Sequence, residues 1–391
     1  MSDKLIIISE DSRLSKKLTT EIIRHLSHID FRVLLAGNMR NLNGNVALNE
    51  SREQLPDVRN SINAVLKKEG DIAVLSANAL PCPIPEGLTV FILAELEHTK
   101  QFEVEKIAIN PLDDKVVVIG RTGDRILYHD LSYLDIRKNY GKLVVVGFGP
   151  GDPEYLTIKG ERALQDADII FYDDLLDSSY LDNFSCRKVR VGKRKDNHTK
   201  SQEEINQLLY NAVTEGKNTV RLKGGDPSIF GRLGEEIRYL RERFVRVEVI
   251  PGVTTASAVS AATGIPLTMR AISSSVAFIS GHNTENVKIP EADTLVIYMG
   301  AHNLDKLCAI LISSGKDPET PVVVVSNVSL PGQVVKNGTL SCFCTRQEIL
   351  TPALIIVSEV INRDEIYQFI HQWQGIHLPH RVISDKANLL T

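Results

Sequence analysis

The sequence predicts an α/β protein of 391 residues, in which a small N-terminal α/β domain precedes two α/β lobes with a cleft between them. Short apolar runs rich in β-branched residues alternate with segments of helical periodicity. The alternation begins afresh near residue 142, and after Pro266 it changes to the texture of a mixed sheet. The length allows two or three domains. The expected parts are an N-terminal domain at 1–140, lobes at 141–265 and 266–362, and a C-terminal tail at 363–391.

The composition excludes several classes of protein. Hydrophobic residues make up 43% and charged residues 24% of the chain, as in ordinary globular proteins, and the formal net charge of -4 gives no sign of a nucleic-acid-binding surface. No apolar run approaches the roughly 18 residues of a membrane span, and we identify no signal peptide, so a cytoplasmic location is expected. Cys342 and Cys344 have strand-like spacing and lack the rest of a zinc knuckle, so no metal site is expected.

The N-terminal domain should alternate strands with helices. Leu18, Ile22 and Leu26 follow helical spacing, and the Asn-rich segment 37–51 is typical of a loop. The expected strands are 5–9, 31–35, 71–75, 89–93 and 115–120, and the expected helices are 12–27 and 58–68.

Two stretches of this domain resemble the first part of hydroxymethylbilane synthases, namely Ser12-Arg13-Leu14 and the run from Gly70 to Pro81. That family carries A-V-H-S-L-K-D-L-P with a catalytic Asp, whereas Leu75, Asn78 and Ala79 stand at the His, Lys and Asp positions here. A methyl group cannot exchange protons as a carboxylate does. The resemblance therefore implies a degenerate remnant without deaminase chemistry, and the alternative is a generic α/β domain.

The second region shows the pattern of a parallel sheet with crossover helices, followed by a mixed sheet. In the first lobe the expected strands are 143–147, 167–172, 219–222 and 246–250, and the expected helices are 157–165, 202–214 and 234–241. In the second lobe strands are expected at 275–280, 294–299, 322–326 and 353–357, with helices at 303–313 and from 362 to about 373.

A turn rich in glycine and proline, Gly147 to Pro153, follows the first of these strands. Its glycines would let a ligand approach the backbone closely. The G-x-G-x-x-G spacing of a dinucleotide site is absent, however, and Pro150 removes an amide donor. By itself the turn fits either a ligand-binding loop or a plain connection from strand to helix.

Many further motifs follow in order, and together they resemble uroporphyrinogen-III C-methyltransferases of the tetrapyrrole methylase family over residues 142–361. The matching motifs are Gly147 to Pro153, Tyr172-Asp173, Val191 to Arg194, His198 with Gln202 to Asn206, Arg221 to Pro227, Ile229 to Arg232, Pro251 to Thr254, Gly264 to Thr268, Gly281-His282, Tyr298 to Gly300 and Pro352 to Val357. The resemblance implies a homodimer that methylates uroporphyrinogen III at C2 and C7 to precorrin-2, for sirohaem or cobalamin. It implies S-adenosylmethionine as methyl donor and S-adenosylhomocysteine as by-product.

The resemblance also implies roles for individual residues. The methyl donor would lie between the lobes, in contact with Pro150, Gly224, Gly225, Asp226, Ile229, Thr254, Thr255, Met299, Val328 and Ala353. Because a proton has to leave the macrocycle, a weak base is useful, and Asp173 at the end of a strand is our candidate. Its alternative role is to cap the next segment. Lys193 is the second candidate catalytic residue.

An acidic protein has to meet the carboxylates of such a substrate with local basic groups. The candidates are Lys193, Arg194, His198, Arg232 and Arg270, and the alternative for the run 193–195 is a solvated loop. Asp174, Met269 and Val328 depart from the family's basic, histidine and glycine positions, which bears on substrate affinity more than on the cofactor. A later precorrin methyltransferase of the same fold and a tetrapyrrole-binding or channelling protein stay open as alternatives.

Overall fold

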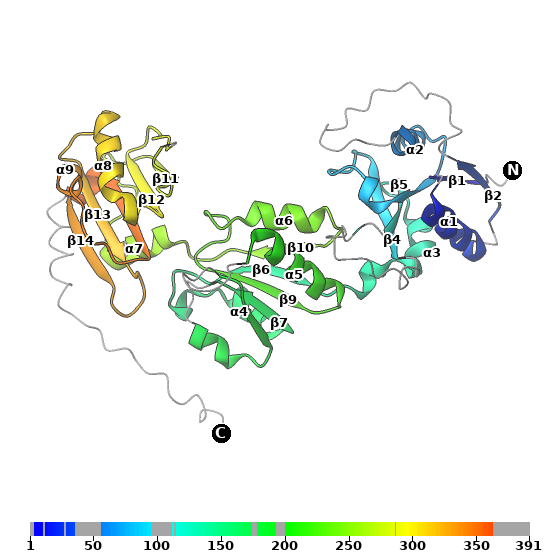
Figure 1. Ribbon diagram of the computed structural model, residues 1–391, viewed down its shortest axis with the longest axis horizontal. Coiled ribbons are helices and arrows are strands. Elements are labelled where there is room, and N and C mark those ends of the chain that lie inside the picture. The colour runs from blue at the N-terminus through cyan, green and yellow to red at the C-terminus, as the bar shows by residue number, and fades with distance from the viewer. Residues whose placement is uncertain are drawn as a thin grey trace.

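The computed structural model describes residues 4–10, 12–26, 29–35, 56–95, 112, 115–173, 178–192, 200–285 and 287–362. These residues form three five-stranded sheets, each with helices packed against it, so the expected α/β class is confirmed. The sheets follow one another along the molecule, with the N-terminal sheet at one end and the last sheet at the other (Figure 1).

The N-terminal sheet has the strand order β2-β1-β3-β5-β4, and β5 runs antiparallel to both of its neighbours. Leu18 of α1 and Leu131 of α3 share a core with Ile72 on one face. Val58 of α2 packs with Leu75 on the other face. The elements are β1 (Leu5–Ser9), α1 (Arg13–His25), β2 (Phe31–Leu35), α2 (Pro56–Leu66), β3 (Ile72–Ser76), β4 (Leu88–Glu95), β5 (Lys115–Arg121) and α3 (Arg125–Leu131).

The first lobe is built on the sheet β10-β6-β9-β7-β8, in which every pair of neighbours is parallel, as the sequence predicts. Leu209 of α5 and Leu240 of α6 share the core on one face, and Leu164 of α4 packs on the other. Helix α5 begins where expected because Ser201 and Glu204 form a capping box. The elements are β6 (Leu143–Gly147), α4 (Ile158–Gln165), β7 (Ile169–Tyr172), β8 (Arg187–Arg190), α5 (Gln202–Thr214), β9 (Thr219–Lys223), α6 (Leu233–Arg241) and β10 (Val247–Ile250).

Tyr140 joins the N-terminal domain to the first lobe. Its side chain packs against the core beneath α2 and also against the core beneath α5. The N–H of Gly141 donates to the carbonyl of Val213 at 2.9 Å, and Phe244 from the turn after α6 packs on the N-terminal core. The N-terminal domain therefore contacts the ends of α5 and α6.

The second lobe has the strand order β11-β12-β15-β13-β14, with β11 and β12 parallel and the other pairs antiparallel, so the expected mixed sheet is confirmed. Leu307 of α8 and Phe343 of α9 fill one face, while Val259 of α7 packs with Val323 on the other. Helix α7 thus shares the core of this lobe although it precedes Pro266. The elements are α7 (Thr255–Thr263), β11 (Val276–Ser280), β12 (Thr294–Tyr298), α8 (Leu304–Ser313), β13 (Pro321–Ser326), β14 (Val334–Thr339), α9 (Leu340–Phe343) and β15 (Ala353–Ser358).

The strand-like interpretation of Cys342 and Cys344 is wrong. The chain forms the short helix α9 here, because Leu340 and Phe343 then face the same core one turn apart. Both cysteines are free, and the residues that the structure describes contain no group of His, Cys, Asp and Glu able to hold a metal ion. Within the same residues no helix is long and apolar enough to cross a membrane. The loop expected at 37–51 and the tail at 363–391 lie outside the described residues.

Candidate functional site

The loops after β6, β9 and β10 meet at one edge of the first sheet, because parallel strands end together there. The N–H of Gly225 donates to the carbonyl of Gly149 at 2.7 Å, and Gly149 returns a bond of 3.3 Å. A Cβ on Gly147 would lie 2.5 Å from the nitrogen of Gly252 and 2.7 Å from the oxygen of Gly225. Only glycine permits these approaches. We call Gly147, Gly149, Gly225 and Gly252 the glycine floor.

Asp226 fastens two of these loops together. Its Oδ1 accepts the N–H of Ser228 at 2.8 Å, and its Oδ2 accepts the N–H of Gly252 at 3.1 Å. The carboxylate therefore links the loop after β9 to the loop after β10. Oδ1 also accepts the hydroxyl of Ser228, so Oδ2 is the oxygen that keeps a further lone pair for a hydrogen bond from a ligand.

Tyr298, the last residue of β12, brings the second lobe to the glycine floor. Its hydroxyl shares a hydrogen bond of 2.7 Å with Thr254 Oγ1 and accepts the N–H of Ala256 at 3.3 Å. Burial raises the pKa of Tyr298, so the hydroxyl stays protonated at neutral pH. A second link runs from the N–H of Asp152 to Ser329 Oγ at 3.3 Å. Both lobes thus line one cleft.

Five residues other than glycine adopt left-handed backbone in the loops around this cleft. Their φ angles are 53° at Phe230, 53° at Arg232, 57° at Met299, 52° at Asn327 and 63° at Ser329. Each such residue costs on the order of 1 kcal/mol or more and persists where the surrounding structure imposes it, which is typical of ligand sites. Met299 in addition keeps 51% of its surface exposed, next to Tyr298.

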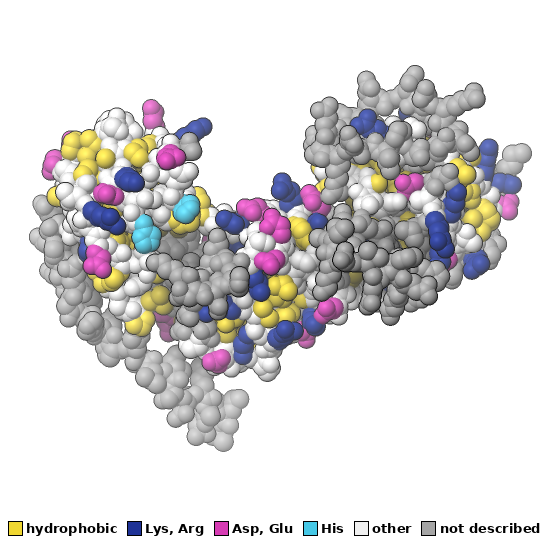
Figure 2. Space-filling view, in the orientation of Figure 1, with side chains coloured by type: hydrophobic (Ala, Val, Ile, Leu, Met, Phe, Trp, Pro, Cys, Tyr) yellow, Lys and Arg dark blue, Asp and Glu magenta, His cyan; other side chains and the backbone are white. Residues whose placement is uncertain are grey.

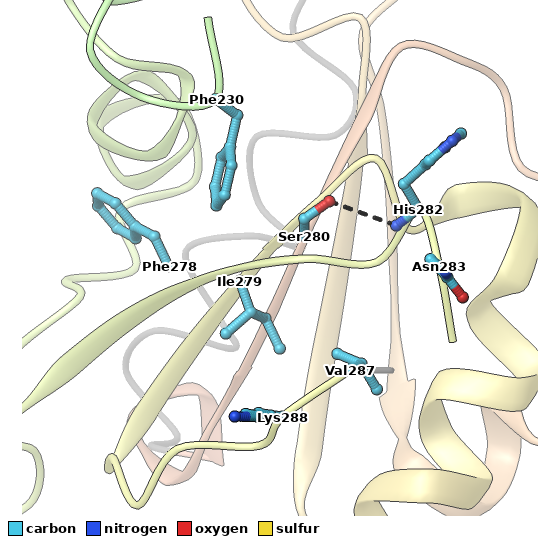
Figure 3. A pocket seen from close by; sticks show the side chains of 8 residues that line it. All are labelled: Phe230, Phe278, Ile279, Ser280, His282, Asn283, Val287 and Lys288. Atoms are coloured by element: carbon cyan, nitrogen blue, oxygen red, sulfur yellow. Dashed lines mark hydrogen bonds between the residues drawn. The ribbon is translucent and has the colours of Figure 1, made fainter. Parts of the chain in front are cut away.

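A pocket of about 360 Å³ is lined by Phe230 of the first lobe and by residues of the second lobe between Phe278 and Lys288 (Figure 3). Phe230 from the first lobe and Phe278 from β11 lie at one end of it, with ring centroids 5.1 and 5.8 Å from that of Tyr298. These two phenylalanines are 42% and 37% exposed, which is unusual for side chains of their size. Ile279 and Val287 add further apolar surface, and the polar side chains of the lining are Ser280, His282, Asn283 and Lys288. In the space-filling view the surface is hollowed between the two lobes, with histidine side chains on the second-lobe side (Figure 2).

A buried ionic cluster lies behind the same edge of the first sheet. Glu236 Oε1 of α6 accepts hydrogen bonds from Arg221 Nε at 3.2 Å and from Lys223 Nζ at 2.9 Å, both on β9. Arg221 Nη2 also donates to Asp173 Oδ1 at 2.6 Å. Burial, together with the charge of Arg221, lowers the pKa of Lys223. Of the four side chains, that of Asp173 is the most exposed at 28%, so it is the member that can meet a ligand.

The structure brings most of the expected cofactor residues to this cleft. Thr255 Oγ1 lies 3.7 Å from the Cβ position of Gly225, and Ala353 opens β15 beside Ser326, next to strained Asn327. Residues on the cleft loops are Pro150, Gly224, Gly225, Asp226, Ile229, Thr254, Thr255, Met299 and Ala353. Val328 is buried in the core beside α7, so only its backbone could face a ligand.

The expected substrate residues are less well assembled. Arg232 precedes α6 and is exposed, and Arg270 is exposed on the connection between α7 and β11. Lys193, Arg194, His198 and Asp174 lie outside the described residues.

The sequence pattern did not reveal the roles of Glu236 or of the phenylalanine pair. Phe230 and Phe278 are 48 positions apart, and both rings contact Tyr298 in the folded chain. The local signal that could have pointed to Glu236 is an acidic residue at a core-facing position of α6.

The chain is similar to one family model and to several known proteins. A family model described as Tetrapyrrole (Corrin/Porphyrin) Methylases matches residues 142–343. The siroheme synthase of Psychrobacter sp. (strain PRwf-1) is 43% identical over 256 residues, which are 62% of this chain and 51% of that protein. The uroporphyrinogen-III C-methyltransferase of Methanocaldococcus jannaschii is 42% identical over 236 residues, which are 57% of this chain and 97% of that protein. The chain thus spans about half the length of the siroheme synthases it matches.

Solved structures agree with these relatives. The native form of uroporphyrin III C-methyl transferase from Thermus thermophilus is similar with a TM-score of 0.50 and 36% identity, covering 56% of this chain and 93% of that one. The form of that protein complexed with S-adenyl homocysteine has a TM-score of 0.50 and 35% identity, covering 57% of this chain and 94% of that one.

Proposed function

The chain belongs to the family of tetrapyrrole (corrin/porphyrin) methylases, and from this premise we propose that it is a uroporphyrinogen-III C-methyltransferase dependent on S-adenosylmethionine. The observation that carries the proposal is its 42% identity to nearly the whole length of the M. jannaschii enzyme of that name. The glycine floor and the strained loops opposite it lie within the matched region.

The cleft fits the methyl donor. Three glycines of the floor pack against neighbouring protein atoms, whereas the Cβ position of Gly225 has only Thr255 Oγ1 near it, at 3.7 Å, so a flat, polar ligand could contact the backbone there. Asp226 could accept hydrogen bonds from hydroxyl or ammonium groups, and Thr254, Thr255 and Met299 would form the opposite wall. The donor would supply an electrophilic methyl group on a positively charged sulfur.

The residues around the cleft would provide orientation, exclusion of water and one proton acceptor. Phe230 and Phe278 present apolar surface that would exclude water from the reacting carbon. Asp173 is our candidate for the base that accepts the proton which the macrocycle loses after methylation. Arg221 holds this carboxylate at the end of β7, as a base of defined orientation requires. Lys193 stays a second candidate.

The substrate would lie against the aromatic pocket with its acidic arms toward basic groups. The rings of Phe230 and Phe278 suit the flat apolar face of a pyrrole, while Lys288 at the same pocket suits a carboxylate. We further assign the arms to Lys193, Arg194, His198, Arg232 and Arg270, as the sequence motifs imply. Exchanging Lys288 for Gln should raise the KM for the tetrapyrrole severalfold and leave the KM for the methyl donor unchanged.

The product would be precorrin-2, methylated at C2 and C7, and the siroheme synthase relatives favour sirohaem as its destination. We propose in addition that the protein is a cytoplasmic homodimer, which light scattering and cell fractionation would test. The N-terminal domain, with Ala79 where the resembling family has its catalytic Asp, would carry no deaminase activity.

One experiment separates this function from its alternatives. Purified protein with S-adenosylmethionine is given uroporphyrinogen III in one reaction and precorrin-2 in another. Consumption of uroporphyrinogen III alone supports the proposal. Consumption of precorrin-2 alone would favour a later methyltransferase, and binding of either without turnover would favour a carrier.

A further inference from the structure

Glu236 is a buried carboxylate that the proposed methyl transfer leaves without a role. Its side chain is 0% exposed, and a buried charge is costly unless it is paired. Its Oε1 accepts from three donors, Arg221 Nε, Lys223 Nζ and Gln202 Nε2 at 3.2, 2.9 and 3.4 Å. Its Oε2 has no hydrogen-bond partner among the described residues. An apolar residue would fill the site without these costs, which suggests a functional reason for the charge.

Arg221 connects this buried carboxylate to the cleft. Its Nε faces Glu236, its Nη1 donates to the carbonyl of Leu222 at 3.1 Å, and its Nη2 donates to Asp173 at 2.6 Å. Three acceptors around one planar group hold the guanidinium in a single orientation. A lysine at this position could not reach all three acceptors at once.

We propose that Glu236 is a positioning residue, which acts through Arg221 to orient the carboxylate of Asp173 and takes up part of the positive charge of that guanidinium. The proposal rests on the proposed function, in which Asp173 is the base. Glu236 shares the guanidinium with Asp173 and so limits how far that cation neutralises the cleft carboxylate. Lys223 balances the charge of Glu236. Within the described chain, the charged groups of this cluster around Asp173 are Arg221 and Lys223 from β9 and Glu236 from α6.

The test is the dependence of kcat on pH in variants of the full chain. Glu236→Gln keeps the size of the side chain and removes its charge, so Arg221 then acts on Asp173 alone. The carboxylate should hold its charge to lower pH and become a weaker base. We expect the acid limb of the kcat profile to move down by about 0.5 to 1 pH unit and the plateau to fall about two- to fivefold, because a neighbouring charge acts on both quantities.

Arg221→Lys should move the acid limb the other way, to higher pH, because it weakens the hold of the cation on Asp173. Glu242→Gln is the matched control, since Glu242 caps the end of the same helix and pairs with Arg243 at 3.9 Å, on the partly exposed surface. It should leave the profile unchanged. Calorimetric binding of S-adenosylhomocysteine and the melting temperature verify that each variant is folded.

Three results would decide against the proposal. These are a Glu236→Gln profile that superimposes on the unmodified one, a fall in kcat without a shift, and shifts of the same sign in Glu236→Gln and Arg221→Lys. If Glu236→Gln does not fold, an upward shift in Arg221→Lys supports the proposal and an unshifted profile overturns it. Asp173→Asn separates failure of this proposal from failure of the proposed function. Full turnover in that variant would exclude Asp173 as the base, whereas the methyltransferase assignment is tested by its own experiment.

Discussion

Replacing Gly147 by alanine should force the backbone of the cleft apart. The new Cβ would lie 2.5 Å from the nitrogen and 2.7 Å from the Cα of Gly252, and 2.7 Å from the oxygen of Gly225. All three atoms are backbone, so no side chain can rotate away. Overpacking of this kind costs about 1–3 kcal/mol, and we expect the upper end of that range because the loops after β9 and β10 both have to move.

Those two loops carry Asp226 and Thr254, so their displacement should also weaken binding of the methyl donor. A loss of about 1.4 kcal/mol in binding corresponds to a tenfold higher Kd. Titration calorimetry with S-adenosylhomocysteine measures the Kd, and urea denaturation measures the free energy of unfolding. The matched control is Gly234→Ala on α6, where nothing lies within 4 Å of the added Cβ. That variant should bind normally and gain up to about 1 kcal/mol of stability from helix propensity. An unchanged Kd and an unchanged free energy of unfolding in Gly147→Ala would refute the claim that close backbone packing at the glycine floor supports the cleft.

Three further predictions concern other parts of the molecule. Tyr298→Phe removes the hydroxyl that bonds Thr254 and should cost about 1–2 kcal/mol in thermal unfolding, with a higher KM for the methyl donor; an unchanged KM would contradict the place of Tyr298 in the cleft. Glu10→Ala leaves the donors around a buried carboxylate unpaired and should cost about 3 kcal/mol of N-terminal stability, whereas methyl transfer at 25 °C should persist; loss of both would show that the domains depend on each other. A hydrogen bond from Thr339 lowers the pKa of Cys342, and burial raises that of Cys308 to about 12, so a thiol reagent at pH 8 should modify Cys342 rapidly and Cys308 only after unfolding.

Elements with strong local signals were predictable from the sequence. Helix α5 is an example, because Ser201 and Glu204 cap it and its apolar residues recur with helical spacing. Helix α7 was not predicted, because its run of Ala, Ser and Thr shows little amphipathic contrast and folds through contact with the second sheet. Strand β8, with the sequence Arg-Lys-Val-Arg, was also missed, because a charged strand at the edge of a sheet lacks an apolar pattern.

The candidate site likewise has parts that could be predicted from the sequence and parts that could not. The loops that carry Gly149, Gly225 and Asp226 could be located from motifs, since each follows a buried strand. The pairing of Arg221 with both Asp173 and Glu236 could not, because these residues come from β9, the end of β7 and α6. The left-handed backbone at Phe230 and Met299 is likewise imposed by contacts that no local pattern encodes.

The central claim is that this cleft methylates uroporphyrinogen III, and the most direct test is the mass of the tetrapyrrole formed from it in the presence of S-adenosylmethionine. The expected product carries two added methyl groups, one for each S-adenosylhomocysteine released, and Asp173→Asn should form little of it. A tetrapyrrole recovered with unchanged mass, from protein that binds S-adenosylhomocysteine normally, would contradict the claim.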